Sequence, residues 1–212
     1  MFGSPMRPAT WPVLVLAVGA LAAASAVRPY LAAAPLAGAD DEDVYPSDIT
    51  PPAGTQYPCA LKPLPRELPG IPEADRAYIN RTYAILLRAT QAKLVLLKAL
   101  AEGRDLPLAL ARYQDATRPL ALRLGAEPPP SGLAAFQQDV QQALDLQQAF
   151  FAEAVPVRAA GSPMAEVYRI PQGRQASARL MSAWGRMQAR YPAWSPDTKD
   201  SIYHHLCALD LF

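Results

Sequence analysis

The sequence predicts an all-helical (all-α) fold, an antiparallel bundle of about five helices that follows an export signal and a proline-rich extended arm. Apolar residues recur at three- and four-residue steps in several segments after residue 72, which is the period of amphipathic helices. Glycine is scarce at 11 of 212 residues, and runs of β-branched residues are nearly absent, which disfavours a sheet. The 23 prolines are clustered, and the clusters mark the linkers.

Residues 1–26 have the pattern of a signal peptide. A single cation, Arg7, precedes an apolar stretch that runs from Trp11 to Ala26 and closes with the small-x-small sequence Ala24-Ser25-Ala26. A basic start, an apolar middle and a small-x-small exit are typical of a cleaved secretory signal. We therefore expect the mature chain to be periplasmic or secreted.

The alternative is an uncleaved membrane anchor through residues 11–27, which would hold the domain at the inner membrane, outside the cytoplasm. About 17 apolar residues at 1.5 Å each reach roughly 25 Å, whereas a hydrocarbon core is about 30 Å thick. A second exit, Ala37-Gly38-Ala39, lies just before the acidic run 40–43. The short span and the small residues favour cleavage.

Residues 27–71 form the proline-rich arm, with nine prolines in 45 residues. Such a stretch is extended and cannot be a helix. By composition it is a linker, but Tyr57, Cys59 and Leu61 give its second half a cysteine and apolar side chains. We therefore expect the second half to dock on the folded domain, which spans residues 72–212.

Cys59 and Cys207 are the only cysteines. In an exported protein an even, small number of cysteines predicts a disulfide, and the alternative is two separate buried thiols. Their spacing excludes a CxxC redox motif, a haem-attachment motif and a cysteine zinc site. The sequence therefore predicts a Cys59–Cys207 bridge, no metal site and no cofactor.

The bundle domain is divided by prolines, glycines and predicted helix caps. Asp105, Ser131 and Ser195 are expected to cap helices at their N-termini, and Gly103 to end one. Pro119 is expected to bend or interrupt the second helix, and Pro156 to end or kink the third. The expected helices cover residues 72–102, 105–124, 131–156, a short turn around 167, 174–191 and 195 onward.

Three polar residues lie on or beside the predicted apolar stripes: Thr90, Lys93 and Gln147. If they converge, they form a polar pocket inside the bundle, and bundle cores do bind ligands between facing helices. The alternative is structural: Thr90 bonds the carbonyl four residues back, Lys93 extends outward and Gln147 bonds one neighbour.

Arg179, Arg186 and Arg190 fall on one flank of a predicted helix, in a region with a single acidic residue, Glu166. They are candidates for a surface that contacts an anion or an acidic partner. The alternatives are a solvated flank or pairing with the acidic run 40–43.

The only histidines, His204 and His205, are adjacent. Neighbouring residues on a helix point about 100° apart, so the two imidazoles do not easily share one metal ion. We expect one to be packed and the other solvated. A haem- or metal-binding bundle that uses Met181 or Met187 with His205 remains a further alternative.

No nucleophile motif such as GxSxG is present, and the net charge of +1 excludes a bulk attraction for nucleic acid. We therefore expect an exported, non-catalytic helical protein of the bacterial cell envelope that binds a partner protein or a small ligand. The alternative is a helical-bundle enzyme that acts on a small anionic substrate through Lys, Arg and Gln residues of the core.

Overall fold

The computed structural model describes residues 50–59 and 70–211. Over these residues the fold contains helices and no strand, which confirms the predicted fold class. The signal sequence, most of the proline-rich arm and the acidic run 40–43 lie outside the described residues. The helices are α1 (Glu73–Glu102), α2 (Leu106–Ala126), α3 (Ala134–Ala159), α4 (Met164–Val167), α5 (Pro171–Arg190) and α6 (Pro196–Leu209).

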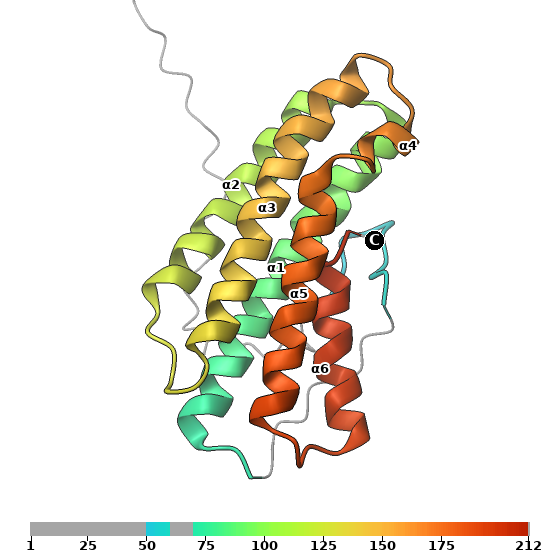
Figure 1. The fold of residues 1–212 in the computed structure, drawn as a ribbon. Helices are drawn as coiled ribbons and strands as arrows, with labels where there is room; N and C mark the ends of the chain where they lie inside the picture. The colour runs from blue at the N-terminus through green and yellow to red at the C-terminus, as the bar shows by residue number, and fades with distance from the viewer. Residues whose placement is uncertain (1–49, 60–69, 212) are drawn as a thin grey trace, which may run out of the picture. The chain divides into compact units, whose positions relative to one another are not determined.

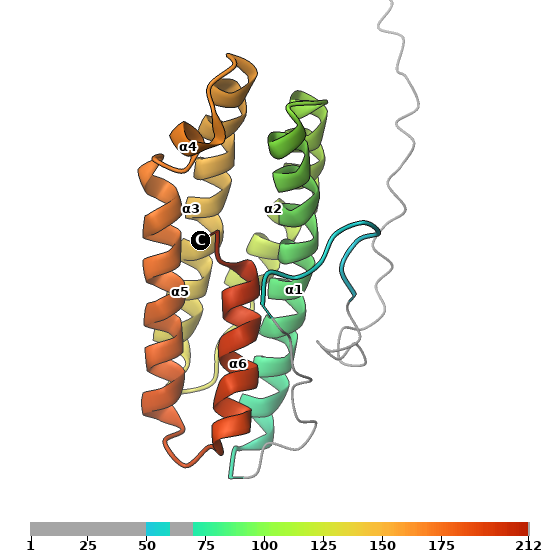
Figure 2. The same cartoon turned by 90° about the vertical axis from the view of Figure 1, so that its right-hand side faces the viewer.

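The five long helices pack in the ring order α1, α2, α3, α5, α6, and α6 closes the ring against α1. Consecutive long helices run in opposite directions (Figure 1). The sixth helix, α4, is a single turn that packs on α3. Helix α6 has 14 residues against 30 in α1, so it occupies one half of the bundle's length, between α1 and α5 (Figure 2).

The hydrophobic core has two parts because α6 is short. The half beside α6 contains large buried side chains such as Tyr83, Leu86, Phe136, Leu180 and Ile202. The other half is filled mainly from α1, α2 and α3, and it is completed by α4 and the C-terminal segment through Val167 and Leu211. Burying one large apolar side chain contributes roughly 1.5–3 kcal/mol, so both halves stabilise the bundle.

Two predicted helix ends are confirmed. Gly103 adopts φ 67° after α1 and donates to the carbonyls of Ala99 and Leu100, a conformation that suits glycine. Ser195 precedes α6, and its Oγ accepts the backbone N–H of Thr198 at 3.2 Å. This bond satisfies one of the donors that every helix start leaves unpaired.

Two predicted caps are wrong. Asp105 occupies the position before α2, but it adopts φ 53° and its carboxylate makes no capping hydrogen bond. Ser131 does not cap α3, because the chain first turns at Gly132, with φ 91°, and the helix begins at Ala134 after Leu133. A capping residue type is a local signal, so it does not predict an extra turn that tertiary packing places before the helix.

Prolines interrupt the helices less than expected. Helix α3 passes through Pro156 and continues to Ala159, and α2 likewise contains Pro119. An interior proline removes one hydrogen bond but does not by itself end a helix whose apolar face is packed. Helix α5 begins at Pro171, earlier than the predicted residue 174, because the fixed φ of proline suits a first helical position.

In the part of the chain that the structure describes, each helix is too short or too polar to cross a bilayer.

Candidate functional site

The predicted polar cluster is brought together in part, around the end of α6. The Lys93 ammonium of α1 donates to the carbonyl oxygens of Ala208 at 2.7 Å and Asp210 at 2.5 Å. The Nε2 of Gln147 on α3 donates to the Leu209 carbonyl at 2.7 Å. Three successive carbonyls at this helix end are therefore satisfied by side chains from two other helices.

Thr90 does not join this contact. Its hydroxyl donates to the carbonyl of Leu86, four residues back on the same helix, at 2.9 Å. Thr90 and Gln147 are fully buried and Lys93 is 1% exposed, and the three grooves described below are lined by other residues. Thr90 and Gln147 make the structural hydrogen bonds that the alternative interpretation expects. Lys93 differs from that interpretation, because its side chain points into the bundle and does not extend outward. Binding of a ligand by them stays a prediction.

Lys93 has an unusual electrostatic position. Burial lowers the pKa of its ammonium group from 10.5 to about 7, and the Asp210 carboxylate opposes that shift. The Asp210 carboxylate is itself held in place, since one oxygen accepts from the Ser177 hydroxyl and from the Leu211 backbone N–H. A lysine whose pKa lies near 7 is a feature of some catalytic sites. Here, however, the hydrogen bonds of the ammonium group go to backbone carbonyls.

Two of the three flank arginines pair with a buried carboxylate that the sequence analysis did not identify. Asp139 on α3 is 2% exposed, and Arg186 Nε lies 2.5 Å and Arg179 Nη1 3.3 Å from its two oxygens. The Ser182 hydroxyl donates to the same group at 2.7 Å. Burial alone would raise the pKa of Asp139, but the hydrogen bonds from Arg186, Ser182 and Arg179 hold it below the usual value.

The third flank arginine belongs to a separate contact at the C-terminal end of α5. Arg190 Nη2 lies 3.4 Å from Asp75 Oδ2 and 3.3 Å from the Ser131 carbonyl oxygen. The Tyr191 hydroxyl donates to the same Asp75 oxygen at 2.6 Å. The half-exposed arginines therefore pair with the buried carboxylates of Asp139 and Asp75. Pairing with the acidic run 40–43 concerns residues outside the described ranges.

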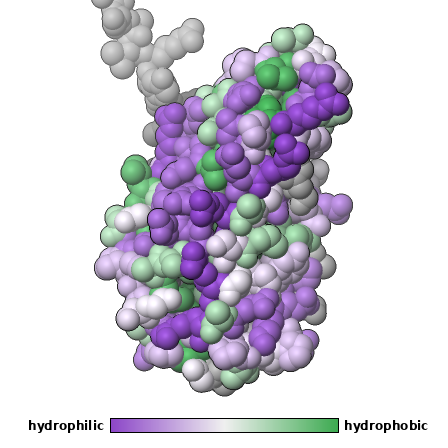
Figure 3. Space-filling view, viewed as in Figure 1, coloured by the Kyte–Doolittle hydropathy of each residue, from purple (hydrophilic) through white to green (hydrophobic). Residues whose placement is uncertain are grey.

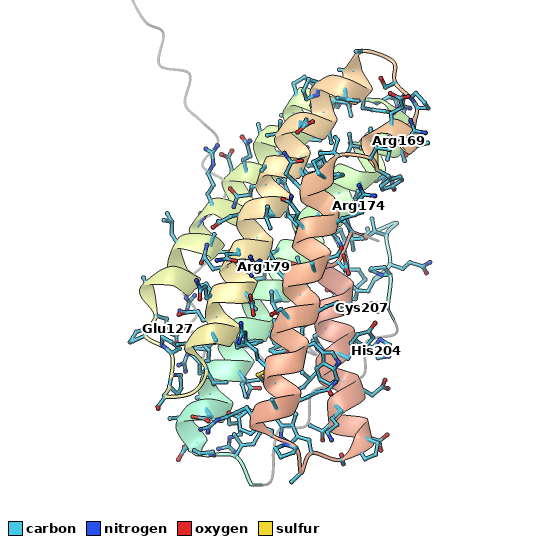
Figure 4. The ribbon with its side chains drawn as sticks, in the orientation of Figure 1. Glu127, Arg169, Arg174, Arg179, His204 and Cys207 are labelled. Carbon is cyan, nitrogen blue, oxygen red and sulfur yellow. A yellow bond between two sulfur atoms is a disulfide. The ribbon has the colours of Figure 1, made fainter. Side chains whose placement is uncertain are left out.

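A groove runs between α3 and α5, beside the Asp139 cluster. It is an open groove with a volume of about 760 Å³, and Gln142, Asp145 and Leu146 face Gln175, Ala178 and Arg179 across it. Arg179 is directed between the two helices, whereas Arg174 lies on the other side of α5 (Figure 4). Hydrophilic side chains cover the surface along α3 and α5, with apolar ones scattered among them (Figure 3). The arrangement offers donors and acceptors on facing walls.

Two further grooves have different linings. One, of about 430 Å³, lies between α2 and α3 beside Leu122, whose side chain is 75% exposed. Asp145 also lines it, so this carboxylate stands on the ridge between two grooves. Another, of about 320 Å³, lies between α1 and α2 with Val95 and Leu108 at its edge. All three grooves have an arginine and a carboxylate among their lining residues. The α3–α5 groove has the largest volume of the three and lies beside the Asp139 cluster.

The Cys59–Cys207 disulfide is confirmed, with the two Cα atoms 6.3 Å apart. It joins segment 50–59 to α6. The same segment contacts α1, because the Gln91 amide donates to the Thr50 carbonyl and Gly54 lies beside the Lys98 ammonium. Burial raises the pKa of Tyr57 in this segment to about 12. The docking of the remainder of the arm falls largely on residues outside the described ranges and stays a prediction.

The two histidines have different surroundings. His205 is fully buried, and its Nδ1 lies 2.7 Å from the Ser201 carbonyl. Its ring meets that of Tyr83 edge to face, with centroids 5.5 Å apart. His204 is 25% exposed, and its Nε2 lies 3.2 Å from a carboxylate oxygen of Asp200. Of the methionines considered with His205, Met187 is buried and Met181 is 39% exposed.

The sequence analysis missed Asp139 and every lining residue of the α3–α5 groove except Arg179. A usable signal existed for Asp139, which follows Phe136 by three residues and precedes Val140 on the apolar stripe of α3. The same criterion selects Gln147. No comparable signal marks Asp145 or Gln175, which are surface residues that gain their position only when α3 and α5 pack together.

Comparisons of this chain with protein-family models, with curated proteins and with solved structures found no match.

Proposed function

We propose that this chain is an exported, non-catalytic binding protein, and that the groove between α3 and α5 holds a small polar ligand. The groove carries this proposal. Its volume of about 760 Å³ falls within the usual range of ligand sites, roughly 300–1,000 Å³. It is built on two long helices, and rigid elements position binding groups more accurately than loops do.

The walls of the groove suggest the chemistry of the ligand. Arg179 offers N–H donors beyond the one that pairs with Asp139, since a guanidinium carries five. Asp145 offers an acceptor, and the amides of Gln142 and Gln175 offer both. A small zwitterion, with an anionic and a cationic group, would match this pattern. The buried Asp139 carboxylate would orient Arg179 without competing for all of its donors.

One observation favours the alternative, an enzyme acting on a small anionic substrate. The pKa of Lys93 near 7 resembles that of catalytic amines. However, the side chain is 1% exposed and its ammonium group is engaged by two backbone carbonyls. These contacts support a structural role for Lys93, and binding without catalysis is therefore the proposal we retain.

Export is part of the proposal, and it places the protein in the periplasm or outside the cell. It is supported by the pattern of residues 1–26 and by the disulfide, which is compatible with an oxidising compartment. Intact-mass analysis of protein from the native envelope should show a start at Val27 or Asp40. Recovery of the full chain in the membrane fraction would instead support the anchor through residues 11–27.

The groove can be tested with a thermal-shift screen of amino acids and other small zwitterions. A ligand at 100 times its dissociation constant stabilises the folded state by about 2.7 kcal/mol, which shifts Tm measurably. Arg179→Gln and Asp145→Asn should each reduce the shift. Arg174→Gln, an exposed arginine on the same helix, is the matched control and should leave it unchanged. Equal shifts in all variants, or no shift with any zwitterion, would contradict the proposal.

A further inference from the structure

Three possible metal ligands meet on the outer side of α6. Cys207 and His204 are three residues apart on that helix, so they lie on the same side of successive turns (Figure 4). Segment 50–59 adds Cys59. The two sulfur atoms and an imidazole nitrogen of His204 all lie within 4.8 Å of one another. The sequence spacing gave no reason to expect this set, because Cys59 is distant along the chain.

The imidazole of His204 is already oriented for coordination. Its Nε2 lies 3.2 Å from Asp200 Oδ1, while its Nδ1 is buried and has no hydrogen-bond partner. A carboxylate that accepts from Nε2–H leaves the lone pair on Nδ1, and metal-binding histidines commonly have such a carboxylate on their second nitrogen. A buried nitrogen without a partner is costly, and coordination would satisfy it.

We propose that reduction of the Cys59–Cys207 disulfide converts this cluster into a binding site for a thiophilic metal ion. In the first step a dithiol reductant gives two electrons and two protons. The S–S bond breaks, Cys59 and Cys207 become thiols, and the reductant becomes a disulfide. In the second step a divalent ion such as Zn²⁺ displaces the two thiol protons and binds two thiolates and the His204 imidazole, with a fourth position for water.

The surroundings favour the return of Cys59 to this position when a metal ion binds the reduced protein. Segment 50–59 has contacts with α1 that do not depend on the disulfide, through Thr50 with Gln91 and Gly54 with Lys98. In a tetrahedral zinc site neighbouring ligand atoms are about 3.5–4 Å apart. The imidazole nitrogen lies within 4.8 Å of both sulfurs, and the sulfurs must move apart to this spacing once the bond between them is broken.

The test is a Zn²⁺ titration of the full chain. The protein is first reduced with a phosphine under anaerobic conditions, and the oxidised protein is titrated for comparison. A chromophoric chelator reports free zinc. The reduced protein should bind one equivalent and release two protons, and the oxidised protein should bind none at this site. His204→Gln should weaken binding by about tenfold or more, and the double variant C59S/C207S should abolish it.

A second measurement distinguishes zinc binding at a folded site from zinc binding by the two thiols of an undocked segment 50–59. Zn²⁺ should restore protection of segment 50–59 against a broad-specificity protease in the reduced protein, but not in reduced His204→Gln. Circular dichroism checks that each variant retains its helices. The proposal is overturned if His204→Gln binds zinc as tightly as the natural sequence does. It is also overturned if the reduced protein binds no more zinc than C59S/C207S.

Discussion

The ammonium group of Lys93 lies 2.7 Å from the carbonyl oxygen of Ala208, so a side chain from the first helix caps the end of the last one. Gln147 makes the neighbouring bond from α3. A helix leaves its last four carbonyls without partners, and both side chains here are almost completely buried. The two bonds therefore satisfy groups that would otherwise destabilise the fold, and they fix the position of α6 in the ring.

Replacement of Lys93 by Met should alter how stability depends on pH. Burial lowers the pKa of Lys93 to about 7 in the folded protein, whereas the unfolded chain has the ordinary value of 10.5. Between these values the unfolded chain holds a proton that the folded protein has released, so stability rises with pH. The rise is at most about 1.4 kcal/mol per pH unit, and Lys93→Met should lack it.

Chemical denaturation at about pH 7 and about pH 9.5 measures this difference. The unfolding free energy of the natural sequence minus that of Lys93→Met should increase as the pH rises. Lys98→Met, at an exposed position of the same helix, is the control and should show no such increase. A difference that stays constant would mean that Lys93 titrates equally in both states.

Replacement of Asp139 by Asn should destabilise the protein by about 1–3 kcal/mol, because Arg179 and Arg186 lose their shared charged acceptor. The loss should be below that of a fully buried ion pair, since both arginines are 48% exposed and water can screen them. Asp115→Asn, at an exposed position on α2, should change stability by less than about 0.5 kcal/mol. Equal effects of the two variants in urea denaturation would show that the cluster contributes little.

Replacement of Ser195 by Ala should cost about 1 kcal/mol, because the Thr198 backbone N–H loses its acceptor at the start of α6. Ser131→Ala is a matched control, since Ser131 has the sequence pattern of a cap but α3 begins only at Ala134. It should leave Tm nearly unchanged. A larger loss for Ser131→Ala than for Ser195→Ala would contradict the assignment of these two helix starts.

Reduction of the disulfide in the presence of a metal chelator should lower Tm and expose segment 50–59 to protease. The bridge closes a separation of 148 residues, and the chain-entropy model gives roughly 5 kcal/mol as an upper estimate for such a loop. The helical signal in circular dichroism should largely persist, because the two core clusters do not contain the bridge. Loss of most helicity on reduction would show that the arm is required for the bundle to fold.

The sequence by itself determined the elements that depend on local signals. Apolar residues at helical spacing were sufficient to predict the helices, and Gly103 and Ser195 were sufficient to predict two of their ends. The disulfide followed from the number of cysteines and the expected compartment. Each of these inferences uses residues within a turn or two of one another, or a count, so no knowledge of packing is needed.

Only the tertiary structure decided which distant groups meet. Lys93 and Asp139 were buried because the faces of helices that carry them turn toward other helices, and their charges then required partners that packing supplied. Asp105 and Ser131 have the right residue types for caps, but the path of the chain into the bundle removed their capping role. Hydrogen-bond and charge partners are long-range choices, set by which surfaces face each other, and a periodic pattern does not contain them.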